Sequence, residues 1–229
     1  MMIRGMIWIA ALAAALYAVI GLALYVFQRR LLYFPDPTHY TPQQAGLAGV
    51  EEIGLATADG ERLVAWYKPA PASAPTLLYF HGNGGGLYLR RKRIEALAGA
   101  GYGVFILGYR GYSGSTGRPT EKALVADGLL AYDYLKAQGV APSRIVLYGE
   151  SLGTGIATQV ASQRQTAALL ILHGSQDSVI PASSSHALFE AANEPKQHVE
   201  FERGGHNDLF NFGALEQVRL FFGKYLVGS

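Results

Sequence analysis

One serine in this sequence stands in a pattern that could make it a nucleophile. A short apolar run at residues 145–148 leads into Gly-Glu-Ser-Leu-Gly at residues 149–153, and small residues then continue in a helical pattern. This order predicts a strand, a tight turn that carries Ser151, and a helix. Glycines beside the serine would let the strand and the helix approach closely. The start of a helix also favours the negative charge that develops when a serine attacks a carbonyl.

A serine of this kind needs a base to take its proton and an acid to orient that base. His206 lies in Gly-Gly-His-Asn-Asp, after the last apolar strand pattern and before the last helix pattern. Asp177 follows the preceding strand pattern, so a loop could bring it toward the same sheet edge. Asp208 is the alternative acid, although capping of the last helix explains it as well. The other histidines are interpreted as structural or surface residues: His39, His81, His173, His186 and His198.

Two backbone N–H groups are candidates for stabilising an oxyanion. One belongs to Leu152, the residue after the serine, and the other to Asn83 in the glycine-rich loop at residues 82–86. A phosphate-binding loop is rejected because no Gly-Lys-Ser or Gly-Lys-Thr follows these glycines. The basic run Arg-Arg-Lys-Arg at residues 90–93 is interpreted as a solvated helix face, with contact to anionic lipid headgroups as the second option.

The elements that must position these groups alternate between strand and helix patterns. Residues 51–68 predict a β-hairpin with Asp59-Gly60 as its turn. Apolar runs at 76–80, 103–108, 145–149, 168–172 and 198–201 predict strands, and helices are expected at about 87–100, 120–137, 182–192 and 212–226. The sequence therefore predicts an α/β fold with a mostly parallel sheet.

The first part of the chain has a different composition. No charged side chain occurs between Gly5 and Phe27, which is long enough for a helix that crosses a bilayer. Arg4 precedes the run, while Arg29 and Arg30 follow it, so charge leaves the orientation open. A cleaved signal peptide is the alternative, but the run is long and ends in Leu-Tyr-Val-Phe, a poor cleavage site. We expect an anchor at residues 1–30, a connector at 31–49 and one globular domain at 50–229.

Overall composition narrows the possible partners. The chain has 229 residues, a net charge of +2 and no cysteine. The absence of cysteine excludes disulfides, a thiol nucleophile and cysteine metal ligands. No basic stripe interleaved with aromatic residues occurs, so nucleic acid is not an expected partner.

The chain resembles the α/β-hydrolase superfamily, in particular the branch with one N-terminal anchor that includes depalmitoylating and lysophospholipase-like serine hydrolases. The resemblance covers nearly the whole chain and rests on Leu-Leu-Tyr-Phe-Pro at 31–35, His-Gly-Asn-Gly-Gly at 81–85 and Tyr-Arg-Gly-Tyr-Ser-Gly at 109–114, besides the serine motif and the segments around Asp177 and His206. It implies Ser151 as nucleophile, Asp177 as acid and His206 as base, with no metal or organic cofactor.

One departure from that family stands out. Members usually have a further strand and helical cap elements between the nucleophile helix and the acid-bearing strand, whereas about two dozen residues separate Ser151 from Asp177 here. We therefore expect the acid-bearing strand to lie beside the Ser151 strand, about 4.8 Å nearer than in the usual layout. A segment that normally walls the acyl pocket would then be missing.

Two functions follow as hypotheses. The first is a single-pass membrane serine hydrolase that cleaves an ester or thioester of a small acyl substrate, with the bilayer as its other partner. The second is a shortened, non-catalytic relative that acts as a membrane-tethered binding or scaffold protein. The serine, aspartate and histidine favour the enzyme, and the missing segment favours the scaffold.

Overall fold

The computed structural model describes residues 2–71, 74–166, 168–192, 194–206 and 208–225, which form two compact units. The first unit, residues 1–34, is built on helix α1 (Met2–Leu32). Its apolar side chains, such as Trp8, Leu12 and Tyr17, are exposed. The stretch Arg4–Leu32 is long and apolar enough to cross a membrane, by length and composition.

The second unit, residues 35–229, contains the predicted hairpin, which follows a segment whose Leu47 and Val50 side chains are buried. Strands β1 (Glu51–Ala56) and β2 (Arg62–Lys68) pair antiparallel around the Asp59-Gly60 turn, which confirms that prediction. Strands β3 (Thr76–Phe80), β4 (Gly103–Leu107) and β5 (Ile145–Gly149) complete a five-stranded sheet in the order β1-β2-β4-β3-β5. The pairs β4–β3 and β3–β5 are parallel.

Helices follow the strands, so the predicted α/β class is confirmed. A short 3-10 helix at Leu87–Arg90 leads into helix α2 (Arg91–Gly99), which comes before β4. Helix α3 (Glu121–Ala137) comes before β5 in the chain, and helix α4 (Leu152–Ala161) follows it. The Thr120 hydroxyl accepts a hydrogen bond from the Ala123 N–H and caps α3, as expected. A further 3-10 helix, Pro142–Arg144, leads into β5.

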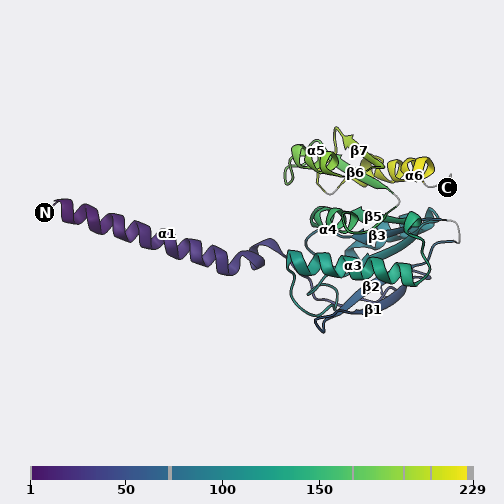
Figure 1. Ribbon diagram of the computed structural model, residues 1–229, viewed down its shortest axis with the longest axis horizontal. Helices are drawn as coiled ribbons and strands as arrows, with labels where there is room; N and C mark the ends of the chain where they lie inside the picture. The colour runs from purple at the N-terminus through teal and green to yellow at the C-terminus, as the bar shows by residue number, and fades with distance from the viewer. Residues whose placement is uncertain (1, 72–73, 167, 193, 207, 226–229) are drawn as a thin grey trace. The chain divides into compact units, whose positions relative to one another are not determined.

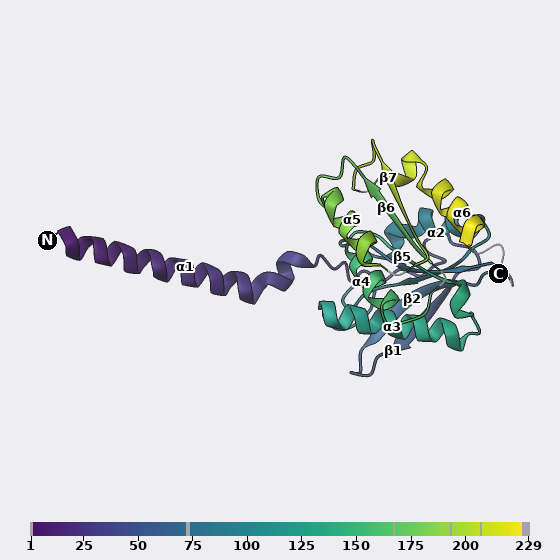
Figure 2. The ribbon, with the colours of Figure 1, turned by 45° about the horizontal axis from the view of Figure 1, so that its top comes forward.

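The C-terminal part forms a separate layer (Figure 1). Strands β6 (Leu169–Gly174) and β7 (Lys196–Phe201) pair parallel as a sheet of their own. Helix α5 (Ala182–Ala191) lies on one side of this pair and α6 (Ala214–Tyr225) on the other (Figure 2). A 3-10 helix at Leu209–Phe212 precedes α6.

The expected position of the acid-bearing strand is wrong. We expected β6 to pair beside β5, but within the described residues β5 pairs only with β3, and β6 only with β7. The expected single, mostly parallel sheet is therefore split in two. Helices α4 and α5 line the same two hollows side by side. Side chains of β5, β6, α4 and α5 line one cavity, and β6 takes its backbone pairing from β7 alone among the described strands.

Helix α6 joins the two sheets on one face. Its apolar side chains share one buried cluster with β3, β4, β5 and α2, and that cluster also contacts β6. In the sequence, Leu215, Val218, Phe222 and Tyr225 occupy one helical face, and all four side chains contact this cluster. The members from α2 and α6 are Ile94, Leu97, Val218, Phe221 and Phe222.

Candidate active site

Ser151 occupies the strained turn that its motif predicts. It is one of two non-glycine residues with positive φ in the described chain, at φ +50° and ψ −115°. A Cβ on Gly149 would lie 2.6 Å from the Gly153 carbonyl oxygen, and one on Gly153 would collide with the Phe80 carbonyl oxygen. Both glycines are therefore required for β5 to turn directly into α4 beside β3.

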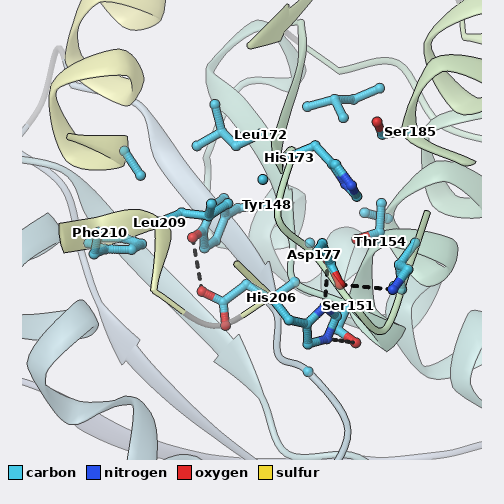
Figure 3. A pocket seen from close by; sticks show the side chains of 18 of the residues that line it. Tyr148, Ser151, Thr154, Leu172, His173, Asp177, Ser185, His206, Leu209 and Phe210 are labelled. Atoms are coloured by element: carbon cyan, nitrogen blue, oxygen red, sulfur yellow. Dashed lines mark hydrogen bonds and ion pairs between the residues drawn. The ribbon is translucent and has the colours of Figure 1, made fainter. Parts of the chain in front are cut away.

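His206 connects Ser151 to Asp177 (Figure 3). Its Nε2 lies 2.9 Å from the Ser151 Oγ, and its Nδ1 lies 2.7 Å from the Asp177 Oδ2. An ionised carboxylate only accepts hydrogen bonds, so the Nδ1 carries the proton and the Nε2 is left to accept from the serine hydroxyl. The three side chains come from the β5–α4 turn, the loop after β6 and the loop after β7.

The Asp177 carboxylate is kept ionised by its own loop. Burial alone would raise its pKa, but the Ile180 N–H, His206 and the Val179 N–H donate to it and together hold the pKa of Asp177 below its ordinary value. A carboxylate that stays negative favours the imidazolium form of its histidine partner. This arrangement therefore supports proton transfer from Ser151 to His206.

Asp208, the alternative acid, makes a different contact. Its Oδ1 accepts a hydrogen bond from the Gly205 N–H at 2.6 Å, which closes the loop that carries His206. It does not cap the helix that follows with its side chain. Among the described residues, the carboxylate that contacts the His206 ring is Asp177.

The glycine-rich loop after β3 lies against the serine turn. A Cβ on Gly82 would be 3.4 Å from the Ser151 Cβ, and Asn83 lines the same cavity as Ser151. The Asn83 Oδ1 accepts hydrogen bonds from the Tyr112 hydroxyl and the Gly84 N–H. Leu152 is the first residue of α4, where backbone N–H groups have no partner within the helix.

Sequence reasoning missed a partly buried polar network beside the serine turn. The Glu150 carboxylate accepts hydrogen bonds from the Tyr79 hydroxyl at 2.6 Å, the Tyr148 hydroxyl at 2.9 Å and Arg93 at 2.5 Å. Burial, with the negative charge of Glu150, holds the pKa of both tyrosines well above its ordinary value. These hydrogen bonds hold Glu150, the residue before Ser151, against side chains of α2, β3 and β5. Its signal in the sequence was a carboxylate inside an otherwise apolar strand-turn pattern.

The interpretation of residues 90–93 as a solvated helix face is wrong for two of its arginines. The Arg93 guanidinium binds Glu150 and lies over the Phe210 ring. Arg90 donates to the carbonyl oxygens of Gly82 and Gly84. These side chains turn inward because the partly buried carboxylate and the loop carbonyls need donors.

His81, at the end of β3, is fully buried behind this loop. Its ring stacks on Tyr109 at 4.1 Å, and the Tyr109 hydroxyl donates to the His81 carbonyl oxygen. Burial lowers the pKa of His81 to about 3. The ring is therefore neutral at pH 7 and serves to hold the loop.

Acid is expected to destabilise the protein through His81. In the unfolded chain this histidine binds a proton below about pH 6.5, whereas the folded state resists protonation down to about pH 3. The free energy of unfolding should fall as the pH drops through that window, by up to about 1.4 kcal/mol per pH unit. Urea unfolding of a variant without residues 1–30 measures the slope. His81→Leu should flatten it, whereas His39→Leu, at an exposed site, should not; equal slopes in both variants would contradict the assignment.

A cavity of about 830 Å³ opens beside Ser151 and His206. Its walls come from β5, β6, α4, α5 and the segment before α6, and Figure 3 shows Tyr148 and Leu172 among its lining side chains. The apolar side chains in its lining include Leu147, Ala157, Leu169, Ile171, Leu188 and Leu209. Among the residues that the structure covers, no cluster of three or more His, Asp or Glu could hold a metal ion.

Comparison with known sequences points to one family. The profile of the alpha/beta hydrolase fold matches residues 75–168. The uncharacterized protein Rv2307c of Mycobacterium tuberculosis is 33% identical, with 82% of this chain and 84% of the relative covered. The alpha/beta hydrolase domain-containing protein 17B of Homo sapiens is 28% identical, with 75% and 74% covered.

Solved structures share the fold at low sequence identity. The esterase Pf2001 of Pyrococcus furiosus superposes with a TM-score of 0.71 at 15% identity, covering 85% of this chain and 98% of the esterase. An acetyl xylan esterase from Paenibacillus sp. R4 gives a TM-score of 0.65 at 18% identity, covering 85% and 98%. At these identities, the likeness shows the fold alone.

Proposed function

Because the chain belongs to the α/β-hydrolase superfamily, we propose that it is a membrane-anchored serine hydrolase that cleaves carboxylic esters or thioesters. The observation that carries the proposal is the continuous contact from the Ser151 Oγ through His206 to Asp177, at the edge of a large cavity. Esterases among the solved structures with this fold support the same class of reaction.

In the proposed reaction, the Ser151 Oγ attacks the acyl carbonyl carbon while the His206 Nε2 takes the hydroxyl proton. The carbonyl oxygen becomes an oxyanion, for which the N–H groups of Leu152 and Asn83 are the proposed donors. When the bond to the leaving group breaks, the protonated His206 gives its proton to the departing oxygen or sulfur.

The second half of the reaction repeats these roles with water. His206 takes a proton from a water molecule, which attacks the acyl-serine ester and releases the carboxylic acid and free Ser151. Asp177 holds the imidazole in one tautomer throughout and stabilises its charged form. The proposed mechanism uses side chains of this chain and no metal or organic cofactor.

A fluorophosphonate probe tests this proposal on the full chain in detergent. Such a probe reacts with a serine whose neighbouring base activates it, so covalent labelling should be rapid and should compete with a short-chain p-nitrophenyl ester. A chain that neither labels nor hydrolyses esters or thioesters would contradict the proposal and favour the non-catalytic scaffold.

The proposal also gives the N-terminal unit a role, as a membrane anchor. We propose that residues 1–30 are the anchor, residues 31–49 a connector and residues 50–229 the catalytic domain. The support is the uncharged run from Gly5 to Phe27 and the exposed apolar surface of α1. A helix of this length, if exposed to water, is stabilised by insertion into a bilayer.

Detergent, rather than high salt or alkali, is expected to extract the full chain from membranes, because the free energy of burying this helix greatly exceeds that of a single lipid chain. A variant without residues 1–30 should appear in the soluble fraction and keep its reaction with the fluorophosphonate, since no proposed catalytic group lies in the deleted part. Membrane fractionation and N-terminal sequencing check this. A mature protein that begins after Phe27 would show a secretion signal instead.

A further inference from the structure

The chain enters the second unit at the loop that lies against Ser151. Pro35, the first residue of this unit, forms a parallel β-bridge with Gly85 of the glycine-rich loop. The next residue is held as well, because the Asp36 carbonyl oxygen accepts a hydrogen bond from the Ser113 N–H at 2.8 Å. The segment that follows α1 in the chain is therefore fixed to a loop of the proposed active site.

Exposed and half-buried side chains form a patch next to this entry point. The patch combines aromatic, apolar and basic groups, and we call it the entry patch: Tyr40, Tyr88, Leu89, Arg91 and Lys92. The ring centroids of Tyr40 and Tyr88 are 4.7 Å apart, and the Arg91 guanidinium lies 4.5 Å from the Tyr88 centroid. Leu89 is 59% exposed, and a Cβ on Gly85 would collide with its side chain. The patch is therefore continuous with the loop that holds the start of the unit.

The basic members of the entry patch have no acidic partner among the described residues. Arg90 and Arg93 point inward, where they bind loop carbonyls and a carboxylate. By contrast, no carboxylate of the described chain forms an ion pair with Arg91 or Lys92. The acidic residue of α2 is Glu95 alone, so the outward charges of this helix sum to a positive value.

The linker between α1 and this patch is short. Only Tyr33 and Phe34 separate α1 (Met2–Leu32) from Pro35, and three extended residues span at most about 11 Å. The uncharged run ends at Phe27, and the helical residues after it add about 7.5 Å. That length is close to the headgroup layer, which is about 5–7 Å thick on each side of a bilayer. If α1 crosses a bilayer, Pro35 therefore lies within about 11 Å of the headgroups.

A lipid surface fits the composition of the entry patch. Tyrosine rings favour the boundary between headgroups and hydrocarbon, and leucine side chains are stabilised by entering it. Lysine and arginine are attracted to anionic headgroups within about one Debye length of the surface. The anchor would also keep the patch at a high effective concentration near the membrane, so a weak affinity is enough for docking.

We propose that the entry patch docks on an anionic lipid surface. Leu89 would enter the headgroup layer, the two tyrosine rings would lie at its boundary, and Arg91 and Lys92 would bind lipid phosphates. The inference rests on the proposed anchor and does not depend on the proposed hydrolysis. Because Leu89 and Lys92 also line the cavity, docking would bring that side of the cavity to the level of the headgroups.

Single-cysteine labelling tests this on the full chain in vesicles, since the sequence has no cysteine of its own. A nitrobenzoxadiazole fluorophore is attached to a Leu89→Cys variant in phosphatidylcholine vesicles with about 30% phosphatidylglycerol. The matched control is Leu220→Cys on α6, because Leu220 is 56% exposed, close to the value for Leu89. Doxyl-labelled lipids should quench the label at position 89 at least about twofold more strongly than the label at position 220.

Charge variants test the anionic part of the proposal. Arg91→Gln combined with Lys92→Gln, in the Leu89→Cys background, should reduce the quenching to the level seen without phosphatidylglycerol. Lys122→Gln combined with Lys136→Gln changes the net charge equally, but both lysines are exposed on α3. This control pair should retain the dependence on phosphatidylglycerol.

Flotation of the vesicles separates failure of the docking from failure of the anchor. Equal quenching at positions 89 and 220 in a chain that floats with the vesicles would overturn the docking and leave the anchor in place. A chain that does not float would contradict the anchor and this inference together. A blue-shifted label at position 89 that the doxyl lipids do not quench would indicate contact with a second copy of the chain and would also overturn the proposal. Quenching that ignores phosphatidylglycerol would overturn the preference for anionic lipid.

Discussion

Replacing Ser151 by alanine is expected to abolish fluorophosphonate labelling and to lower kcat for ester hydrolysis by about 10⁴-fold or more. The reason is that the Ser151 Oγ is the group that the His206 Nε2 contacts, at 2.9 Å, in the turn between β5 and α4. Initial rates with a p-nitrophenyl ester and gel fluorescence of the labelled chain measure both effects.

Ser162→Ala is the matched control for this variant. Ser162 lies at the other end of α4, where its hydroxyl donates to the Gln159 carbonyl, and it has no part in the proposed chemistry. Its labelling and kcat should equal those of the parent chain. Undiminished labelling of the Ser151→Ala variant would mean that the reactive serine lies elsewhere.

Asp177→Asn is expected to lower kcat on the order of 10⁴-fold while KM changes little. The asparagine would fill the same volume, but its amide cannot hold the His206 Nδ1–H as an ionised carboxylate does, so the imidazole would lose both its tautomer and the support for its charged form. Because the pKa of Asp177 is held low, its carboxylate is charged throughout the neutral range, and only the substitution removes that charge.

Asp208→Asn distinguishes the role of the Asp208 carboxylate from that of Asp177. The asparagine oxygen can still accept from the Gly205 N–H, so the loop should keep its shape and kcat should stay within about threefold of the parent value. A mild effect of Asp177→Asn together with a severe effect of Asp208→Asn would assign the acid role to Asp208.

Short-range patterns allowed most of the elements to be predicted. The turn at Ser151 leaves no room for a Cβ at Gly149 or Gly153, and both glycines are part of the short motif itself. The Asp59-Gly60 turn and the Thr120 cap are equally local. Asp177 and His206 could be placed near the serine because loops after neighbouring parallel strands meet at one edge of a sheet.

Contacts between segments that are distant in the sequence explain the features that could not be predicted. The spacing between Ser151 and Asp177 suggested adjacent strands, but β6 pairs with β7, and residues of β5 and β6 line a common cavity. The inward turn of Arg93 depends on Glu150, more than fifty residues away in the chain, and helical periodicity alone does not reveal such a partner. Both features depend on packing between segments, which a local pattern does not contain.

Site mapping by tandem mass spectrometry tests the central claim most directly. The full chain in detergent is treated with one equivalent of a fluorophosphonate, digested and sequenced, with an excess of p-nitrophenyl ester as competitor in a parallel sample. The account predicts a single adduct, on Ser151, whose yield falls when the ester is present. An adduct on any other residue, or no adduct from a folded chain, would contradict it.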